Sequence, residues 1–274
     1  MAFRFVAAAL ALGLFPGAAL AAPSAALPLA SHRAAYDLSL ANPADRVGSL
    51  QSPVAASGMI DYEFRGSRCE GYTSVFRQIT RMVRSEGEPL ASGVTATSFE
   101  DADGKSMRFQ VQPEGADPTP AVAGTAMREG GNLRVQLTKP ADKSFDLGQN
   151  ILFPTQQVEK LIETANAGGR ILQARVYDGS ETGAKIFATL AIIGKEAKGP
   201  SVDDKIAGLR GVRRWPVVVS YFDEASKKST PDYTLSFDLY ENGISGSVKL
   251  DYGQFALNAK LKTLELLPGG ACPK

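Results

Sequence analysis

The sequence predicts an all-β, mainly antiparallel fold: a barrel-like or strongly curved sheet of a dozen or more strands with one principal helix packed on it. Apolar and polar residues alternate in many short runs, which is the pattern of strands with one buried face. Turn signals separate these runs, and the chain contains 27 glycines and 16 prolines. Only one segment changes to the 3.6-residue period of an amphipathic helix. Many strands at short spacing are typical of a strongly curved sheet.

The C-terminal part carries the clearest strand pattern. Every second residue from Tyr233 to Leu239 is apolar. Asn242-Gly243 follows, and this pair favours a tight hairpin because both positions tolerate φ > 0. The alternation continues in 244–252 and again in 255–267. These runs predict an antiparallel meander without a catalytic motif.

The N-terminal half repeats this pattern in shorter runs. Residues 113–120 are a proline-rich stretch between two of these runs, and we interpret them as a surface loop. Turn residues at 101–104 and 130–132 indicate two hairpins. The predicted strands are 34–40, 58–64, 69–83, 94–99 paired with 107–111, and 125–128 paired with 133–137.

The predicted helix runs from about Pro154 to Gly168. Proline suits the first helical position, Thr155 can cap the helix, and Gly168-Gly169 ends it. A single helix among many strands is expected to lie on the sheet or to plug an open end. Its apolar stripe consists of Val158, Leu161, Ile162 and Ala165.

Residues beyond the helix return to the strand pattern. Ile171–Tyr177 and Lys185–Ile193 indicate another hairpin, and Trp215–Phe222 is a continuous apolar strand. Between them, the polar and glycine-rich residues 196–211 are expected to form a mobile loop. Residues 224–232 are expected to form a solvated loop.

The first 21 residues have the pattern of a secretory signal peptide. Arg4 precedes the apolar stretch 5–14, and Ala19-Leu20-Ala21 is a small-x-small cleavage site. A membrane anchor would need about 20 apolar residues, and Pro16-Gly17 interrupts this run. We therefore predict cleavage after about Ala21 and a soluble, exported protein.

The predicted organisation after cleavage is simple. Residues 22–31 are expected to form a flexible leader, and residues 32–274 a single β-spiral domain. Removing Arg4 leaves 29 basic residues, from 30, against 29 acidic residues. This balance gives no electrostatic reason to expect nucleic acid or an anionic membrane as a partner.

Candidate catalytic and metal-binding patterns are weak. The only histidine, His32, falls at the predicted leader, which argues against a Ser-His-Asp triad or a multi-histidine zinc site. The segment 101–104 begins like a calcium loop but lacks the later ligands. The segment 179–185 lacks the glycine spacing of a phosphate loop. We therefore predict no catalytic residue, metal or cofactor.

Two features remain as candidate sites. An oxidising compartment favours a disulfide between Cys69 and Cys272, the only cysteines, whereas two reduced thiols are the alternative. Several aromatic residues could line an apolar cavity, or could simply form the core. The candidates for the cavity are Tyr72, Phe76, Trp215, Tyr221 and Phe237.

Five segments are distinctive when they are taken together in this order: Cys69–Thr73, Phe153–Gln156, Tyr177–Ser180, Trp215-Pro216 and Tyr240–Gly243. With them the sequence resembles the cell envelope integrity protein EipB family of Gram-negative bacteria, over about His32 to Cys272. The resemblance implies a periplasmic protein with a spiral, broken-barrel β-sheet and a disulfide between Cys69 and Cys272. It also implies a role in envelope maintenance without established catalysis, and a general likeness to lipoprotein-carrier half-barrels.

The functional prediction is therefore a non-enzymatic periplasmic protein that maintains envelope integrity by binding a periplasmic protein partner. One alternative is a carrier or sensor of a lipid or other apolar acyl ligand, since a curved sheet can expose a concave apolar face. Another is an unrecognised hydrolase, against which the scarcity of histidines and thiols argues.

Overall fold

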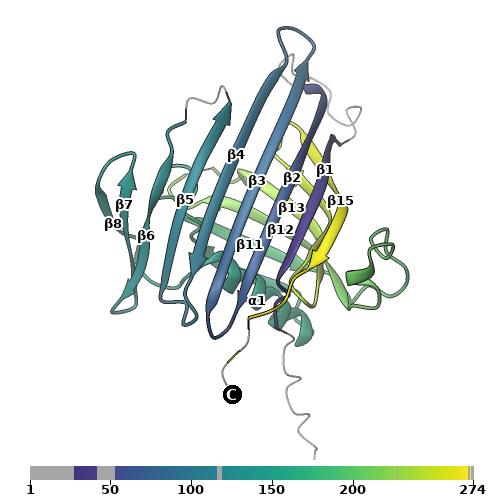
Figure 1. The fold of residues 1–274 in the computed structure, drawn as a ribbon. Helices are drawn as coiled ribbons and strands as arrows, with labels where there is room; N and C mark the ends of the chain where they lie inside the picture. The colour runs from purple at the N-terminus through teal and green to yellow at the C-terminus, as the bar shows by residue number, and fades with distance from the viewer. Residues whose placement is uncertain (1–27, 42–52, 116–118, 227, 271, 273–274) are drawn as a thin grey trace, which may run out of the picture.

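A computed structural model describes residues 28–41, 53–115, 119–226, 228–270 and 272, and it confirms the predicted fold class (Figure 1). The predicted signal peptide and most of the predicted leader lie outside the described residues. The strands and helices are β1 (His32–Leu40), β2 (Pro53–Ser67), β3 (Gly71–Arg84), β4 (Leu90–Glu100), β5 (Ser106–Gly115), β6 (Val122–Glu129), β7 (Asn132–Lys139), β8 (Lys143–Asp146), β9 (Ile151–Leu152), α1 (Pro154–Asn166), β10 (Ile171–Val176), β11 (Phe187–Ile193), the 3-10 turn η2 (Ala207–Leu209), β12 (Arg214–Asp223), β13 (Tyr233–Tyr240), β14 (Ser245–Asp251) and β15 (Ala256–Leu266).

In the described part of the chain, fifteen strands form one sheet with the order β8-β7-β6-β5-β4-β3-β2-β1-β15-β14-β13-β12-β11-β10-β9. Neighbours are antiparallel except β9 and β10, which pair in parallel. The sheet curls into a spiral but does not close into a barrel, because its end strands β8 and β9 are not hydrogen-bonded to each other. The pairing of β1 with β15 places the two ends of the domain next to each other in the middle of the sheet.

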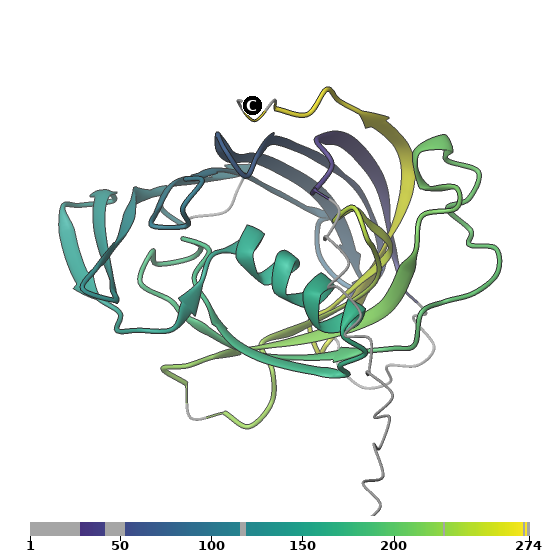
Figure 2. The ribbon, with the colours of Figure 1, turned by 90° about the horizontal axis from the view of Figure 1, so that it is seen from below.

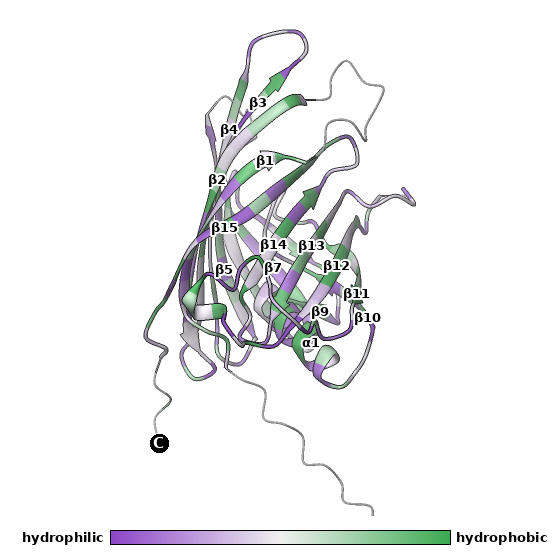
Figure 3. Ribbon diagram, turned by 90° about the vertical axis from the view of Figure 1, so that its right-hand side faces the viewer, coloured by the Kyte–Doolittle hydropathy of each residue, from purple (hydrophilic) through white to green (hydrophobic). Residues whose placement is uncertain are grey.

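The curl of the sheet gives it a concave inner face and a convex outer face. Successive side chains of each strand point to these two faces in turn. Figure 3 shows hydrophobic and hydrophilic residues interleaved along the strands. In β15 the inward residues Leu257, Ala259 and Leu261 are buried, while Asn258 and Lys260 between them are exposed. The period-2 pattern of the sequence therefore identified the inner face of this strand correctly.

Helix α1 lies inside the curve of the sheet (Figure 2), as the sequence predicts for a single helix. Leu161, Ile162 and Ala165 are buried in a core cluster with Trp215 and residues of β11 to β13. The helix ends as predicted: Gly168 has φ 76°, and the Gly169 N–H donates to the Thr164 carbonyl oxygen at 2.8 Å.

A segment between β10 and β11, residues 177–186, fills the space between the two ends of the sheet. We call it the closing loop. Tyr177 is fully buried, packs edge-on against Phe109 of β5 at a centroid distance of 5.6 Å, and donates to the Gly183 carbonyl oxygen. A Cβ at Gly179 would lie 2.4 Å from the Phe109 ring, so this close approach requires glycine. The loop thus joins both ends of the open sheet through side-chain packing.

Three expectations are corrected by the structure. The predicted leader is wrong for residues 28–31, because Leu29 is buried and the Ala30 N–H donates to the Asn242 carbonyl oxygen. The prediction of a mobile loop over residues 196–211 is wrong for Asp203 and Leu209, because both are buried against β13, β14 and the turn that joins them. Thr155 does not cap α1: the Gln156 side chain does this by accepting the Phe153 N–H at 3.0 Å.

Candidate functional site

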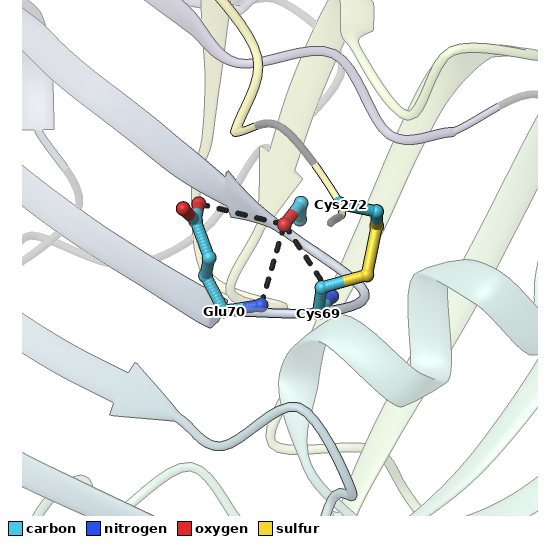
Figure 4. Close-up of a disulfide and its surroundings, with 4 residues drawn as sticks. Cys69, Glu70 and Cys272 are labelled. Carbon is cyan, nitrogen blue, oxygen red and sulfur yellow. Dashed lines mark hydrogen bonds between the residues drawn. A yellow bond between two sulfur atoms is a disulfide. The ribbon is translucent and has the colours of Figure 1, made fainter. Parts of the chain in front are cut away.

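The predicted disulfide is present between Cys69 and Cys272, with a Cα–Cα distance of 5.4 Å (Figure 4). Cys69 lies in the turn between β2 and β3, and Cys272 lies in the tail that follows β15. The Ser67 hydroxyl accepts the N–H groups of Cys69 and Glu70, which fixes the turn. A Cβ at Gly270 would lie 1.9 Å from a Glu70 carboxylate oxygen, so a side chain here would require the flexible Glu70 side chain to move.

The aromatic residues proposed for an apolar cavity all come from inward-facing positions, but they divide into two groups. Tyr72 and Trp215 are buried in the core cluster under α1, which supports the core interpretation for these two. Phe76, Tyr221 and Phe237 pack only partly against the core. The structure therefore leaves these three, and not the whole set, partly accessible on the inner face.

Partly exposed apolar side chains continue beyond these three. We define the inner apolar wall as Phe76, Val94, Val111, Leu235, Phe237 and Leu250, which share the inward phase of their strands and are neither fully buried nor fully exposed.

A cavity of about 70 Å³ lies at the N-terminal end of α1, and Ser74, which precedes Phe76 of the wall on β3, lines it. Tyr62 connects the two, because it lines the cavity and pairs in register with Phe76. The strands β1 to β4 supply one side, and the helix start and the β13–β14 turn supply the other. The lining residues are Leu29, Ala30, His32, Tyr62, Phe64, Ser74, Glu100, Pro154, Thr155, Val158, Asn242 and Gly243.

Glu100 is the charged residue of this cavity, and only 4% of it is exposed. Thr155 in the first turn of α1 donates to it three times: N–H to Oε1 at 3.0 Å, N–H to Oε2 at 3.2 Å, and Oγ1 to Oε1 at 2.8 Å. Burial raises the pKa of Glu100 to about 7, although the Thr155 bonds oppose this shift. Neutral pH therefore divides Glu100 between its charged and neutral forms.

His32 lines the same cavity, which corrects its placement in a flexible leader. It is 3% exposed, and its Nδ1 lies 2.7 Å from the Ala30 carbonyl oxygen, where a neutral ring donates. Burial lowers its pKa, so the ring is neutral at pH 7 and its Nε2 is an acceptor. The ring begins an aromatic row that continues through Tyr62 and Phe64 to Tyr72.

Sequence reasoning missed both Glu100 and His32 as parts of one site. In the sequence, Glu100 is one of two adjacent carboxylates and is followed by Asp101. The sequence did contain one indication of its position. Glu100 and Val94 are an even number of residues apart on β4, so strand alternation places both side chains on the inward face. Only the fold could bring it to Thr155, which is 55 residues away.

The Glu100→Gln variant should flatten the pH dependence of stability between about pH 4.5 and pH 7. The folded-state pKa of about 7 exceeds the ordinary value of 4.5, so the folded protein binds more protons in this range. The contribution of Glu100 is therefore complete at low pH and is lost as pH rises, by about 3 kcal/mol in total.

Chemical denaturation at pH 4.5, 6 and 8 measures this effect as the difference between the two proteins. The pKa of His32 is lowered, so its contribution to stability has the opposite pH dependence and is lost as pH falls. Because His32 is present in both proteins, this contribution cancels when the two stabilities are subtracted. An equal pH slope in wild type and variant would contradict the assignment.

Among the described residues, no group of three or more histidine, cysteine, aspartate or glutamate side chains is arranged to hold a metal ion. A search of the same part of the chain for helices long and apolar enough to span a bilayer identifies none.

Comparison with known proteins agrees with this architecture. Residues 23–268 match the family model described as EipB-like. The chain is 38% identical over 260 residues to the cell envelope integrity protein EipB of Brucella abortus (strain 2308), a match that covers 93% of this chain and 90% of the relative. It also matches the crystal structure of a beta-barrel-like protein of Brucella abortus that contains a domain of unknown function. That match has a TM-score of 0.80 and 35% identity, and it covers 88% of this chain and 99% of the other. This chain therefore belongs to the EipB-like family.

Proposed function

We propose that this protein is a non-enzymatic periplasmic component that helps to maintain cell envelope integrity by binding a ligand with an apolar chain. The envelope role is supported by the name of the Brucella relative. The periplasmic location is supported by the signal-peptide pattern of residues 1–21. The observation that favours an apolar ligand is the inner apolar wall, whose side chains lie inside an open sheet without being fully buried.

The wall has the chemistry that an acyl chain needs. Phe76 and Leu250 pack on one core cluster and Phe237 packs on another, so the wall bridges both halves of the curved sheet. Removing apolar area from water contributes about 25 cal/mol per Å², whichever apolar chain supplies the area. A concave apolar surface with a few polar groups at one end is the usual form of a small-ligand site.

Adjacent residues of β3 provide a matched test. Phe76 faces inward, whereas Val75 faces outward with 37% of its surface exposed. Phe76→Gln should weaken the binding of monolauroylglycerol, a neutral lipid with one acyl chain, by about 10-fold or more, since a buried aromatic side chain contributes about 1.5–3 kcal/mol. Val75→Gln should leave the affinity unchanged. Isothermal titration calorimetry measures both.

Equal affinities for the two variants would contradict a site on the inner wall. Native mass spectrometry of protein purified from its own periplasm provides a second test, because it should show a retained acyl-bearing molecule. If wild type neither retains such a molecule nor binds the lipid, the apolar-ligand proposal is wrong.

A protein partner is the second candidate, and one observation favours it. Ile171, Ile192 and Val218 are direct neighbours in register on the outer face of β10 to β12, with exposures of 64%, 55% and 38%. Such a row on a convex sheet suits protein contact better than a small ligand. Ile192→Asp should abolish a contact on this row without affecting lipid binding. Crosslinking in intact cells with an unchanged pattern would contradict this candidate.

A further inference from the structure

The cavity at the N-terminal end of α1 contains a buried carboxylate, that of Glu100, which has no counter-ion in the part of the chain that the structure describes. Among the described residues, no lysine, arginine or histidine forms a salt bridge with Glu100. The charge of Arg128 has only a minor effect on the pKa of Glu100. Arg128 instead donates to the Gly104 carbonyl oxygen and to Gln156. Because an unpaired buried charge is costly, a cation that enters the cavity would gain this carboxylate as its partner.

The carboxylate also has unused hydrogen-bonding capacity. Oε1 accepts the Thr155 hydroxyl and the shorter bond of the Thr155 amide, at 3.0 Å. From the described residues, Oε2 accepts only the longer bond of that same amide, at 3.2 Å. A carboxylate oxygen can accept about two hydrogen bonds. Oε2 therefore retains acceptor capacity on a residue that lines the cavity.

Aromatic rings form part of the remaining wall. His32 lies 5.6 Å from Tyr62 and 6.0 Å from Phe64 between ring centroids, and all three rings line the cavity. Aromatic faces attract cations, and they favour alkylated ammonium groups because these are weakly hydrated. Neutral His32 adds no positive charge that would repel such a group.

The same cavity is poorly suited to an anion. The described residues that line it include neither lysine nor arginine. A helix N-terminus ordinarily attracts anions through its free N–H groups. Here Pro154 has no N–H, and the Thr155 N–H is used by Glu100. The first two residues of α1 thus offer no amide to a phosphate or carboxylate.

We propose that this cavity binds an organic ammonium group of the choline or ethanolamine class, with Glu100 as its counter-ion and with His32, Tyr62 and Phe64 as aromatic walls. The register pairing of Tyr62 with Phe76 connects the site to the inner apolar wall. The inference therefore names a head group for the ligand of the proposed function. It rests on that function for the attached chain, whereas the ammonium site itself can be tested with a chain-free cation.

Calorimetric titration with choline at pH 8 tests the site alone. Choline should bind the full-length mature protein, and its neutral isostere 3,3-dimethylbutan-1-ol should bind about 10-fold more weakly, because it lacks the charge. Glu100→Gln should weaken choline binding by about 10-fold or more while retaining the acceptor for Thr155. Glu163→Gln, on the exposed side of α1, should have no effect.

Tyr62 variants guard against a folding defect in the Glu100 variant. Tyr62→Leu should weaken choline binding, whereas Tyr62→Phe keeps the aromatic face and should preserve it. Circular dichroism establishes that each variant is folded. Equal binding of choline and its neutral isostere, or unchanged choline binding in both folded Glu100→Gln and folded Tyr62→Leu, would overturn the proposal.

Acidification provides an independent readout. Choline keeps its charge at every pH, so its binding should weaken from pH 8 to pH 5 as Glu100 becomes protonated, in line with its pKa of about 7. The other titratable groups near Glu100 are His32 on β1, Tyr62 on β2, Tyr72 on β3, Arg128 on β6 and Glu159 on α1. Protonation of His32 would also repel choline at low pH. The Glu100→Gln variant should show the smaller pH dependence.

Chain-bearing probes distinguish a lipid head group from a free amine. Dodecyltrimethylammonium, used below its micelle concentration, should bind more tightly than choline and more tightly than dodecyl sulfate if the site receives a lipid. If choline binds but no dodecyl compound gains affinity, the ligand is a free amine and the apolar-ligand function fails. If both dodecyl compounds bind equally and choline does not bind, the apolar-ligand function stands and the ammonium site fails.

Discussion

Replacing either cysteine by serine should lower the melting temperature by about 5–15 °C. The Cys69–Cys272 bridge joins residues separated by 203 positions. For a loop of this length, chain entropy predicts a stabilisation of about 5 kcal/mol, which native strain and residual unfolded structure reduce. A domain of this size loses about 2–4 °C per kcal/mol.

The position of the bridge gives a reason to expect a local effect as well. It holds the tail after β15 on the β2–β3 turn, and Arg68 in that turn forms a salt bridge with Glu159 of α1 at 3.2 Å. The tail is otherwise held near its start by the Leu267 N–H, which donates to the Ser31 carbonyl oxygen. Loss of the bridge should therefore expose the C-terminal tail to proteases before the rest of the domain.

The two single variants and the double variant form an internal control. Each removes the same covalent link, so all three should melt at about the same temperature, and wild type treated with a reductant should approach them. Differential scanning calorimetry measures these temperatures. Peptide mapping of non-reduced, alkylated protein should recover the linked peptides, and two alkylated thiols in protein purified from its own cells would contradict the bridge.

Local pattern was sufficient for much of the fold. The alternation from Tyr233 to Leu239 and the Asn242-Gly243 turn predict a hairpin, and β13 and β14 form it. Hydrophobic period and hairpin turns act between neighbours in the chain, so these parts of the architecture are encoded within about 20 residues of sequence.

Long-range packing accounts for what the sequence did not reveal. The pairing of β1 with β15 joins residues more than 200 positions apart, as in His32 with Leu266, and no local pattern specifies it. The sequence of the closing loop predicts an ordinary hairpin connection. In the structure, its residues Tyr177 and Gly179 pack against Phe109 of β5. The Glu100 cavity depends on both the curl of the sheet and the placement of α1.

Leu161→Ala should destabilise the protein by about 2–5 kcal/mol, as the truncation of a buried leucine does. Leu161 is 2% exposed and belongs to the core cluster that contains Trp215, Val217 and Val219. Alanine favours the helix, so propensity does not cause the loss. The cost arises from removing apolar contacts and leaving space between α1 and the sheet.

Lys160→Ala is the matched control for this substitution. Lys160 is the preceding residue on α1, its side chain is 53% exposed, and it contacts Glu163 through a surface ion pair. Such pairs contribute about 0–1 kcal/mol, so this variant should melt within a few degrees of wild type. Equilibrium urea denaturation gives both free energies. An unchanged free energy of unfolding for Leu161→Ala would show that α1 does not pack on the sheet through this face. In that case the Thr155–Glu100 contact would lose its structural support, because the burial of Leu161, Ile162 and Ala165 is what holds the start of α1 against β4.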